Sequence, residues 1–476
     1  MGPAQAWGMA FVGRQAELGT LEEQYAAPGS SFVPIYGRRR VGKSELILRF
    51  AEAKPALYYV GKTAPPALQM EELGREAARV LGEPLLASSG VTDWKRLLIN
   101  IVERHRGPQK LVLALDEFQW LAHASPELPG VLQDCWDNRW RRAGNVMLIL
   151  CGSYVGFMER EVLGKRSPLF GRRTAQIKLL PFGYREAQDF HPSWSLVERA
   201  RAYFVCGGVP TYLTLFDPAR SVEQNIESVI LGEFGPLFRE PDFLLREELR
   251  EVDNYYALLV AVANGHATSS QIAAASGLPE RSLHYYLQQL SELGYIGRRS
   301  PLTGSRPSQR QVRYSLEDPL LRFWFRFVFP NLSYLQQAGP NKAFRERIRP
   351  ELDAYFGTCF ERLCREALGR LYVRDGVNAP FSVGEYWSKD TQIDVVGLRE
   401  DGVTDIGECK WGAVRSVPKL LDELSAKAGA YPNLRGATIK KHLFVRERPP
   451  KEHRDSKKQE GSEATVKWHD LADLYR

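Results

Sequence analysis

The sequence predicts a multidomain α/β protein whose first part is built on a parallel sheet. An apolar run, a glycine-rich loop and a helical pattern follow one another over residues 31–50, and further apolar runs at 110–120 and 145–153 suit buried parallel strands. Near the carboxyl end, an expected hairpin carries charged residues at alternating positions. The length of 476 residues allows two to four domains. We expect the segments 1–175, 176–250, 251–330 and 331–476.

The composition is that of an ordinary globular protein. Hydrophobic residues make up 44% and charged residues 25%, enough for several buried cores. Lysine and arginine number 64 against 57 acidic residues, and this excess of +7 permits a nucleic-acid partner without requiring one. The six cysteines are scattered with no CxxC pair, as in reduced proteins. Because we find no signal-peptide pattern and no run of about 18 apolar residues, we expect a cytoplasmic protein without a membrane partner.

The loop after the first apolar run reads Gly37-x-x-x-x-Gly42-Lys43-Ser44, the pattern of a phosphate-binding loop (P-loop). Its glycines let backbone N–H groups close around phosphate oxygens, and the next helix offers its positive end. Lys43 would place its charge on the β and γ phosphates, and the Ser44 hydroxyl would ligate Mg²⁺. A chance match is the alternative, but strand, loop and helix come in the required order.

Two later apolar runs end in polar residues at the expected carboxyl edge of the sheet. The first ends in Asp116 and Glu117. Asp116 would complete the Mg²⁺ shell, and Glu117 would orient or deprotonate the attacking water. The second run ends in Ser153, which would sense the γ phosphate. Each signal is weak alone, but together with the loop they predict one nucleotide site.

Four segments resemble the archaeal-type ATPases, in the signal-transduction branch of the AAA+-related P-loop proteins. They are FVGRQAEL (11–18), the loop at 37–44, LDE (115–117) and CGGVPTYL (206–213). The resemblance covers roughly residues 9–240. It implies an ATPase that uses ATP and Mg²⁺, with a P-loop core in 1–175 and a helical lid in 176–250.

In that family, residues outside the loop also contact the nucleotide. A Gly-Arg pair near the start lies by the base, here Gly13 and Arg14, and a Gly-x-Pro in the lid contacts the nucleotide, here ending in Pro210. The family places an arginine finger where this chain has SPLFGRRT, so Arg172 or Arg173 would stabilise transition-state charge, in cis or from a neighbour in a homo-oligomer. A solvated turn is the alternative for these two arginines.

Residues 252–316 are similar to winged helix-turn-helix domains, with three helices followed by a hairpin. Thr268 or Ser269 can cap a short helix, and four leucines between 283 and 293 share one helical face. The hairpin carries five arginines and no acid between 297 and 313, a pattern typical of phosphate contacts. A winged helix used for packing or protein contacts is the alternative. The expected DNA contacts are Arg281, Arg298, Arg299, Arg306 and Arg310.

The segment TQIDVVGLREDGVTDIGECKWG (391–412) is typical of a β-hairpin. Its turn favours a three-residue loop with Gly402 in the left-handed region. That register places Asp394 directly opposite Glu408, with Lys410 on the same face, whereas a two-residue loop would separate the two acids. Facing carboxylates repel each other unless a divalent cation lies between them, and oxygen ligands favour Mg²⁺ or Mn²⁺.

The spacing Asp-x(13)-Glu-Cys-Lys resembles the PD-(D/E)XK nuclease core, and ECKW adds similarity to the nuclease-like domain that often follows archaeal-type ATPases. This resemblance covers about residues 345–476. It implies a restriction-endonuclease-like α/β domain with Glu361 as the upstream helix acid and Lys410 acting on water or phosphate. Two features depart from the pattern: no proline precedes Asp394, and the helix at 417–431 offers Lys427 but no clear catalytic partner. A degenerate fold kept for DNA or protein binding is the alternative.

The sequence therefore leaves two functions open. In the first, an ATPase couples a nucleotide switch to DNA binding and metal-dependent DNA cleavage. In the second, a nucleotide-switched DNA-binding or signalling scaffold carries an inactive nuclease-like domain. The catalytic residues of the first function would be Glu117 and Ser153 at the ATP site, and Glu361, Asp394, Glu408 and Lys410 at the nuclease-like site.

Overall fold

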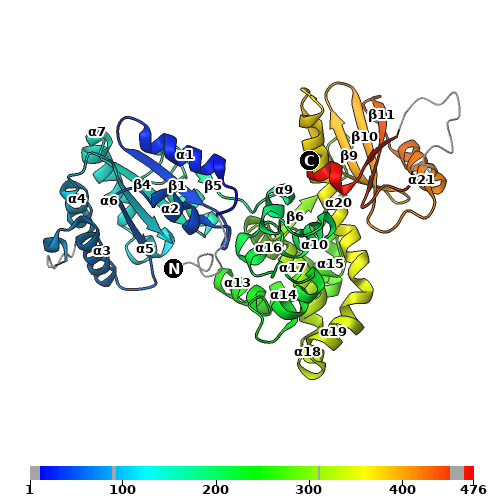
Figure 1. Ribbon diagram of the computed structural model, residues 1–476, viewed down its shortest axis with the longest axis horizontal. Helices are drawn as coiled ribbons and strands as arrows, with labels where there is room; N and C mark the ends of the chain where they lie inside the picture. Colours follow the sequence, from blue (N-terminus) through cyan, green and yellow to red (C-terminus); the bar gives the residue numbers. More distant parts are fainter. Residues whose placement is uncertain (1–10, 88–92, 250, 309–310, 451–465) are drawn as a thin grey trace. The chain divides into compact units, whose positions relative to one another are not determined.

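The computed structural model describes residues 11–87, 93–249, 251–308, 311–450 and 466–476 (Figure 1). The chain forms two compact units. The first is Met1–Phe182 with Val209–Thr211, and the second is Gly183–Gly208 with Tyr212–Arg476. The division into four domains is finer than this and stays a prediction.

The first unit contains a five-stranded, fully parallel sheet in the order β2-β3-β4-β1-β5. The inner strands β1, β3 and β4 are buried along their whole length, as their unbroken apolar sequences predicted. The parallel-sheet core is thus confirmed. The strands are β1 (Ser31–Tyr36), β2 (Ala56–Val60), β3 (Leu111–Asp116), β4 (Val146–Gly152) and β5 (Ile177–Lys178).

Helices cover both faces of this sheet because successive strand residues point to opposite sides. On β3, Leu113 and Leu115 pack with one set of helices, whereas Val112 and Ala114 pack with the other. The first set is α3 (Pro66–Leu81), α4 (Trp94–Arg104), α5 (Phe118–Ala124) and α6 (Leu128–Cys135), and the second is α1 (Gln15–Ala26) and α2 (Lys43–Ala51). Short helical segments follow at Pro84–Leu86, Trp136–Trp140, Arg141–Ala143, Val155–Phe157 and Met158–Val162.

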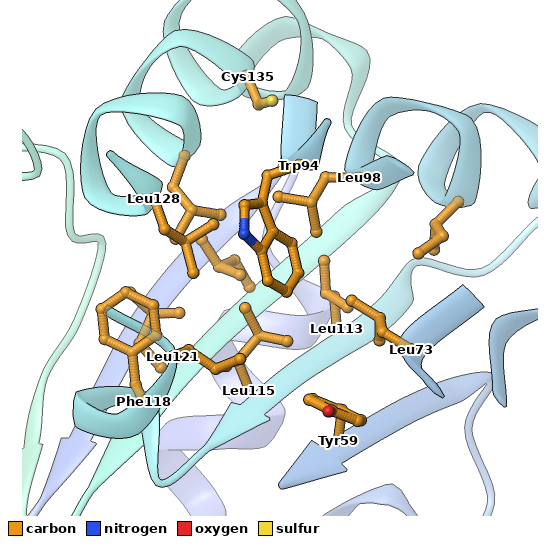
Figure 2. Packing of buried hydrophobic residues seen from close by; sticks show 14 of the residues in the cluster. Tyr59, Leu73, Trp94, Leu98, Leu113, Leu115, Phe118, Leu121, Leu128 and Cys135 are labelled. Carbon is orange, nitrogen blue, oxygen red and sulfur yellow. The ribbon is translucent and has the colours of Figure 1, made fainter. Parts of the chain in front are cut away.

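Trp94 lies at the centre of the larger of these cores, among side chains from the sheet and from α4, α5 and α6 (Figure 2). Its indole N–H donates to Ser125 Oγ over 2.8 Å, so the buried polar atom is paired. Leu115 of β3 packs in the same core as Trp94. The next residue, Asp116, ends β3 and carries the first candidate carboxylate.

The second unit begins with helices and a short hairpin. Thr268 caps α15 by accepting a hydrogen bond from the backbone N–H of Gln271, as the sequence indicated. Strands β6 (Ile296–Arg299) and β7 (Arg313–Leu316) form an antiparallel pair. The larger helices are α10 (Leu196–Cys206), α13 (Glu240–Glu248), α14 (Val252–Ala263), α15 (Ser269–Ser276) and α16 (Glu280–Glu292). Shorter segments lie at Tyr184–Ala187, Gln188–Phe190, Pro210–Thr214, Val222–Asn225 and Ile226–Leu231.

A second sheet, separate from the first, has the order β12-β11-β10-β9-β8. Strands β8, β9 and β10 are antiparallel neighbours, whereas β11 and β12 join in parallel. The strands are β8 (Phe381–Trp387), β9 (Gln392–Arg399), β10 (Val403–Lys410), β11 (Thr438–Val445) and β12 (Lys467–His469). The helices that contact this sheet are α20 (Arg349–Arg374), α21 (Val417–Ala430) and α23 (Leu471–Tyr475). The segments before α20 pack among the helices of the unit: α17 (Pro319–Phe323), Trp324–Val328, Phe329–Asn331, α18 (Leu332–Ala338), α19 (Pro340–Ala343) and Phe344–Ile348.

Helices α20 and α21 pack on opposite faces of this second sheet. On β10, Asp405 bonds to Tyr372 of α20, whereas Ile406 packs with Leu420 and Leu424 of α21. By the alternation of a strand, Glu408 and Lys410 share the α21 face with Ile406.

Candidate functional site

The P-loop joins β1 to α2 and is held by close backbone packing. A Cβ on Gly37 would lie 2.1 Å from the carbonyl oxygen of Leu179, so only glycine fits there. Gly42 has φ 89°, a left-handed conformation that glycine adopts without strain. These two positions explain the glycines of the motif in steric terms.

Lys43 is buried at the first turn of α2. Its Nζ donates to the carbonyl oxygens of Gly37 (2.8 Å) and Arg38 (2.9 Å), so the ammonium lies inside the curve of the loop. Burial lowers the pKa of Lys43, although the nearby Glu117 and Asp116 partly oppose this effect. An anionic phosphate in the loop would favour the charged lysine.

Ser44 and Asp116 meet across the end of the sheet. Ser44 Oγ donates to Asp116 Oδ2 over 2.6 Å, and the Tyr58 hydroxyl donates to the same oxygen over 2.5 Å. A hydroxyl and a buried carboxylate side by side fit Mg²⁺, which takes oxygen ligands and keeps several waters or phosphate oxygens. The position of Asp116 at the end of β3 agrees with the prediction, whereas Tyr58 is an addition from β2.

Glu117 follows in a left-handed conformation with φ 48°. Ser153 Oγ donates to Glu117 Oε2 over 2.6 Å, and the Gln119 amide donates to the same carboxylate oxygen. Glu117 and Ser153, expected near one another, are therefore in direct contact. The strained backbone at Glu117 directs its side chain toward β4.

The other expected nucleotide contacts lie in the same unit. Arg14 donates to the carbonyl oxygens of Val41 (3.2 Å) and Leu180 (2.7 Å), and its guanidinium lies 3.9 Å from the centre of the Phe182 ring. Gly13 has φ 66°. Pro210 lies beside Gly42, since a Cβ on Gly42 would be 3.7 Å from its ring.

The two candidate finger arginines differ in their surroundings. Arg172 is held by Asp137, with its Nε 2.9 Å and its NH2 2.6 Å from the carboxylate, and it also donates to the carbonyl oxygens of Pro168 and Phe170. Arg173 has an exposed side chain. The ion pair with Asp137 thus distinguishes Arg172 from the exposed Arg173, and the assignment of either as a finger stays a prediction.

The second candidate site lies on the β9–β10 hairpin. The register pairs Val395 with Gly407, and continuing it by one residue places Asp394 opposite Glu408. Gly402 has φ 79° in the three-residue turn, as the turn sequence predicted. Asp394 Oδ2 accepts from the backbone N–H of Cys409, and both carboxylates are buried.

Two lysines bind Glu408. Lys410 Nζ lies 3.0 Å from its Oε1, and Lys427 Nζ, from α21, lies 2.5 Å from its Oε2. Lys410 stays partly exposed and does not enter the apolar core. Lys427 is the residue that the sequence offered from this helix, and its contact with Glu408 is an addition from the structure.

Carboxylates crowd this site. Burial and the neighbouring Glu408 raise the pKa of Asp394 to about 6, and burial and Asp394 raise the pKa of Glu361 to about 8. A divalent cation would relieve this crowding. Among the residues that the structure describes, no three His, Cys, Asp or Glu side chains are arranged to hold a metal. The facing pair alone would supply two carboxylates, and water and substrate oxygens would have to complete the shell of Mg²⁺ or Mn²⁺.

The basic hairpin, formed by β6 and β7, differs from the prediction in the surroundings of one arginine. Arg299 does not face solvent, because its guanidinium binds Glu317 (3.1 Å) and Glu385 (3.0 Å). The sequence could not show this, since Glu385 is far away in the chain. Arg281, Arg298 and Arg306 are exposed, and Arg310 lies outside the described residues.

Comparison with known proteins identifies the first part of the chain. The family described as an ATPase domain predominantly from Archaea matches residues 11–216. Over these residues the chain is similar to archaeal-type ATPase domains. Its match contains the P-loop, Asp116, Glu117 and Pro210, whose geometry is given above. A second family, described as archaeal and bacterial proteins of unknown function, matches residues 324–420.

One protein by sequence and two solved structures are similar to this chain over part of its length. An uncharacterised protein of Methanocaldococcus jannaschii is 29% identical over 427 residues, 88% of this chain and 92% of that protein. A Walker-type ATPase of Pyrococcus abyssi is 20% identical with a TM-score of 0.47, covering 66% of this chain and 96% of that one. The Aeropyrum pernix ORC2 protein is 16% identical with a TM-score of 0.42, covering 68% and 95%.

Across the described ranges, no helix is both long and apolar enough to cross a membrane.

Proposed function

We propose that this protein binds and hydrolyses ATP at the P-loop with Mg²⁺. The observation that carries the proposal is the contact of Ser44 with Asp116, at 2.6 Å, beside the buried Lys43. When bound, Mg²⁺ neutralises charge on the phosphates. Lys43 holds the β and γ phosphates, Glu117 accepts a proton from the attacking water, and Ser153 orients Glu117.

The ATPase test uses two substitutions. Glu117→Gln should retain ATP binding and lose turnover by about 100-fold or more, because the group that accepts the proton is gone. Lys43→Ala should lose ATP binding itself. Phosphate release and nucleotide titration measure the two effects, with Glu127→Gln, an exposed acid of the same unit, as the matched control. Normal turnover in Glu117→Gln would remove this residue from its role.

A second function concerns the facing carboxylates. We infer that Asp394 and Glu408 hold a divalent cation for phosphodiester hydrolysis in DNA, supported by their opposition in the hairpin and by the two lysines beside them. The cation would neutralise charge on the scissile phosphate. Asp394 and Glu408 would position it, Lys410 would stabilise developing negative charge, and Glu361 would exchange a proton near neutral pH.

Asp394→Asn tests this second function. DNA cleavage with Mg²⁺ or Mn²⁺ should be abolished, because one of two carboxylate ligands is lost, and a chelator should abolish wild-type cleavage as well. Asp390→Asn is the matched control, since Asp390 is exposed in the turn before β9. If wild-type protein bound DNA and cleaved none of it under either metal, a nucleotide-switched scaffold with an inactive nuclease-like domain would be the function instead.

The proposed DNA surface consists of Arg281, Arg298 and Arg306 on α16 and the basic hairpin, used in the manner of a winged helix. All three side chains are exposed, and cations at the surface are the usual contacts to phosphates. Arg299 is not included because of its ion pairs with Glu317 and Glu385.

A further inference from the structure

A cavity of about 550 Å³ lies within the second unit, between the basic hairpin and helix α20. Its volume is in the range of small-molecule sites. Neither the P-loop residues nor Asp394, Glu408 and Lys410 line it. Its walls come from α10, the end of β6, the start of α17, α20 and β8, with the lining residues concentrated on one face of α20.

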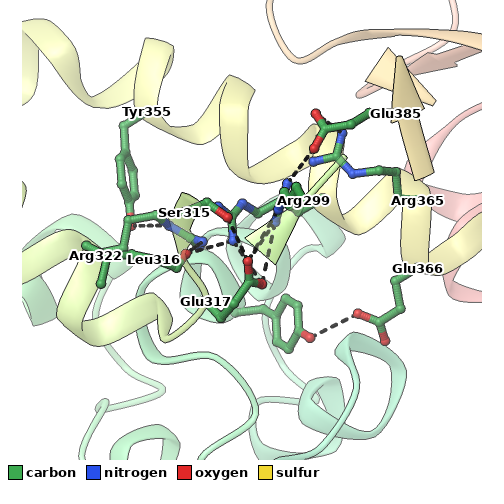
Figure 3. A network of polar contacts seen from close by, with 11 residues as sticks. Arg299, Ser315, Leu316, Glu317, Arg322, Tyr355, Arg365, Glu366 and Glu385 are labelled. Carbon is green, nitrogen blue, oxygen red and sulfur yellow. Dashed lines mark hydrogen bonds and ion pairs between the residues drawn. The ribbon is translucent and has the colours of Figure 1, made fainter. Parts of the chain in front are cut away.

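Arginines outnumber acids in this cavity. The lining includes four guanidinium groups, from Arg299, Arg322, Arg362 and Arg365, against the three carboxylates of Glu317, Glu366 and Glu385. Figure 3 shows how these groups are connected across the hairpin, α17 and α20.

Two of the arginines are incompletely neutralised. Glu317 is shared between Arg299, at 3.1 Å, and Arg362, at 3.3 Å. Arg362 and Arg322 both donate to the carbonyl oxygen of Leu316, at 2.8 and 3.2 Å, which is a neutral acceptor. Arg322 also donates to the Tyr355 hydroxyl (Figure 3). Arg322 and Arg362 thus converge on one neutral carbonyl oxygen, and only Arg362 of the two also binds the carboxylate that Arg299 shares.

The electrostatic surroundings of the two arginines differ: burial disfavours the charged form of both, but Cys359 and Tyr355 raise the pKa of Arg322. Burial and the neighbouring Arg322 lower the pKa of Arg362 to about 9. Burial alone would raise the pKa of Glu317, yet Arg362 and Arg299 lower it to about 2. Arginine is suited to bind phosphate because its planar fork donates two parallel hydrogen bonds.

The rest of the cavity is suited to an organic group. Phe204, Pro319, Leu363 and Val383 form apolar walls. At another part of the lining, the Tyr203 hydroxyl donates to Glu366 over 3.1 Å. This pair offers a hydroxyl and a carboxylate to a polar substituent.

We propose that the cavity binds a small phosphorylated molecule, with its phosphate on Arg322 and Arg362 and its organic part against Phe204, Pro319 and Leu363. The site is independent of ATP hydrolysis and of DNA cleavage. It lies next to the second candidate site through Arg365, which donates to the backbone carbonyl of Asp394 over 2.6 Å and lies 3.5 Å from Glu385. Arg365 is therefore the residue that lines the cavity and also contacts the hairpin with the facing carboxylates.

The experiment uses the full chain with Lys43→Ala, which removes the phosphate contact of the P-loop lysine. Inorganic pyrophosphate is the probe, measured by calorimetric titration. Ser300 lines the cavity, so Ser300→Glu would place a competing carboxylate near the arginines, whereas Ser300→Gln adds the same volume without charge. Pyrophosphate affinity should fall at least tenfold in Ser300→Glu relative to Ser300→Gln, because an ionic hydrogen bond to the phosphate is lost.

Two further measurements distinguish a weakened binding site from a protein that has failed to fold. In phosphate-free buffer, Ser300→Glu should unfold at a higher temperature than Ser300→Gln, because the added carboxylate neutralises the arginines. Arg362→Gln should weaken pyrophosphate binding by roughly 10- to 100-fold. Equal affinity in the two Ser300 variants, or no binding to the Lys43→Ala protein at about 10 mM pyrophosphate, would overturn the proposal.

Discussion

At the scale of single residues, close backbone packing restricts which residue types fit in the P-loop as much as phosphate binding does. Gly37 faces the carbonyl oxygen of Leu179, with no room for a Cβ, while Gly19 in α1 has open space around it. The same substitution should therefore have opposite effects at these two positions.

Gly37→Ala should lower the free energy of unfolding by about 3 kcal/mol, because the new methyl group must displace the backbone near Leu179. Gly19→Ala should raise it by about 0.5–1 kcal/mol, because alanine loses less backbone entropy in a helix. Chemical denaturation measures both. A Gly37→Ala protein as stable as the wild type would show that this close approach does not exist in solution.

Residues with local signals could be predicted, and residues positioned by distant chain segments could not. Asp394, Glu408 and Lys410 follow from strand alternation and one turn, so their common face was predictable. Tyr58 and Arg299 were not, because their partners Asp116 and Glu385 are set by tertiary packing. The buried contact of His442 with Asp405, at 2.7 Å, was missed for the same reason.

At the scale of elements, the arginines of the basic hairpin differ in their surroundings. Arg298 and Arg306 are exposed, whereas Arg299 links β6 to Glu385 on β8. The backbone strengthens this link, since the Leu302 N–H donates to the Glu385 carbonyl oxygen over 2.8 Å. Arg299 thus joins the hairpin to the second sheet, and the exposed Arg298 and Arg306 are the residues proposed to contact DNA.

Replacing Arg298 and Arg306 together by glutamine should weaken DNA binding at all sequences. If both contact duplex phosphates, the log–log salt slope should decrease by roughly 2 units, at about 0.9 per contact. Arg299→Gln is the matched variant. It should leave the slope unchanged and lower the unfolding temperature, because Glu385 and Glu317 lose a partner. Salt titration of DNA binding distinguishes the two, and an unchanged slope in the double variant would exclude the hairpin from DNA.

At the scale of the whole molecule, the two units have separate hydrophobic cores and separate sites. The parallel sheet was predictable from buried apolar runs, and so was the existence of a second sheet. The sequence did not predict which face of the second sheet α20 covers and which face α21 covers. The alternation of a strand shows which residues share a face, but it does not show which helix packs on that face. Every P-loop site residue, including Pro210, belongs to the first unit, whereas Asp394, Glu408 and the arginine-lined cavity belong to the second.

This separation predicts that each ligand stabilises one unit. A ligand that binds only the folded state adds about 2.7 kcal/mol at 100 times its Kd. In the Glu117→Gln protein, ATP with Mg²⁺ should therefore raise the unfolding temperature of the first unit by roughly 5–10 °C, because a kilocalorie shifts a domain of this size by about 2–4 °C. The transition of the second unit should stay in place, and Lys43→Ala should remove the shift. Scanning calorimetry resolves the two transitions. If ATP moved both transitions equally, the two units would unfold as one, and the independence of the two sites would be lost with it.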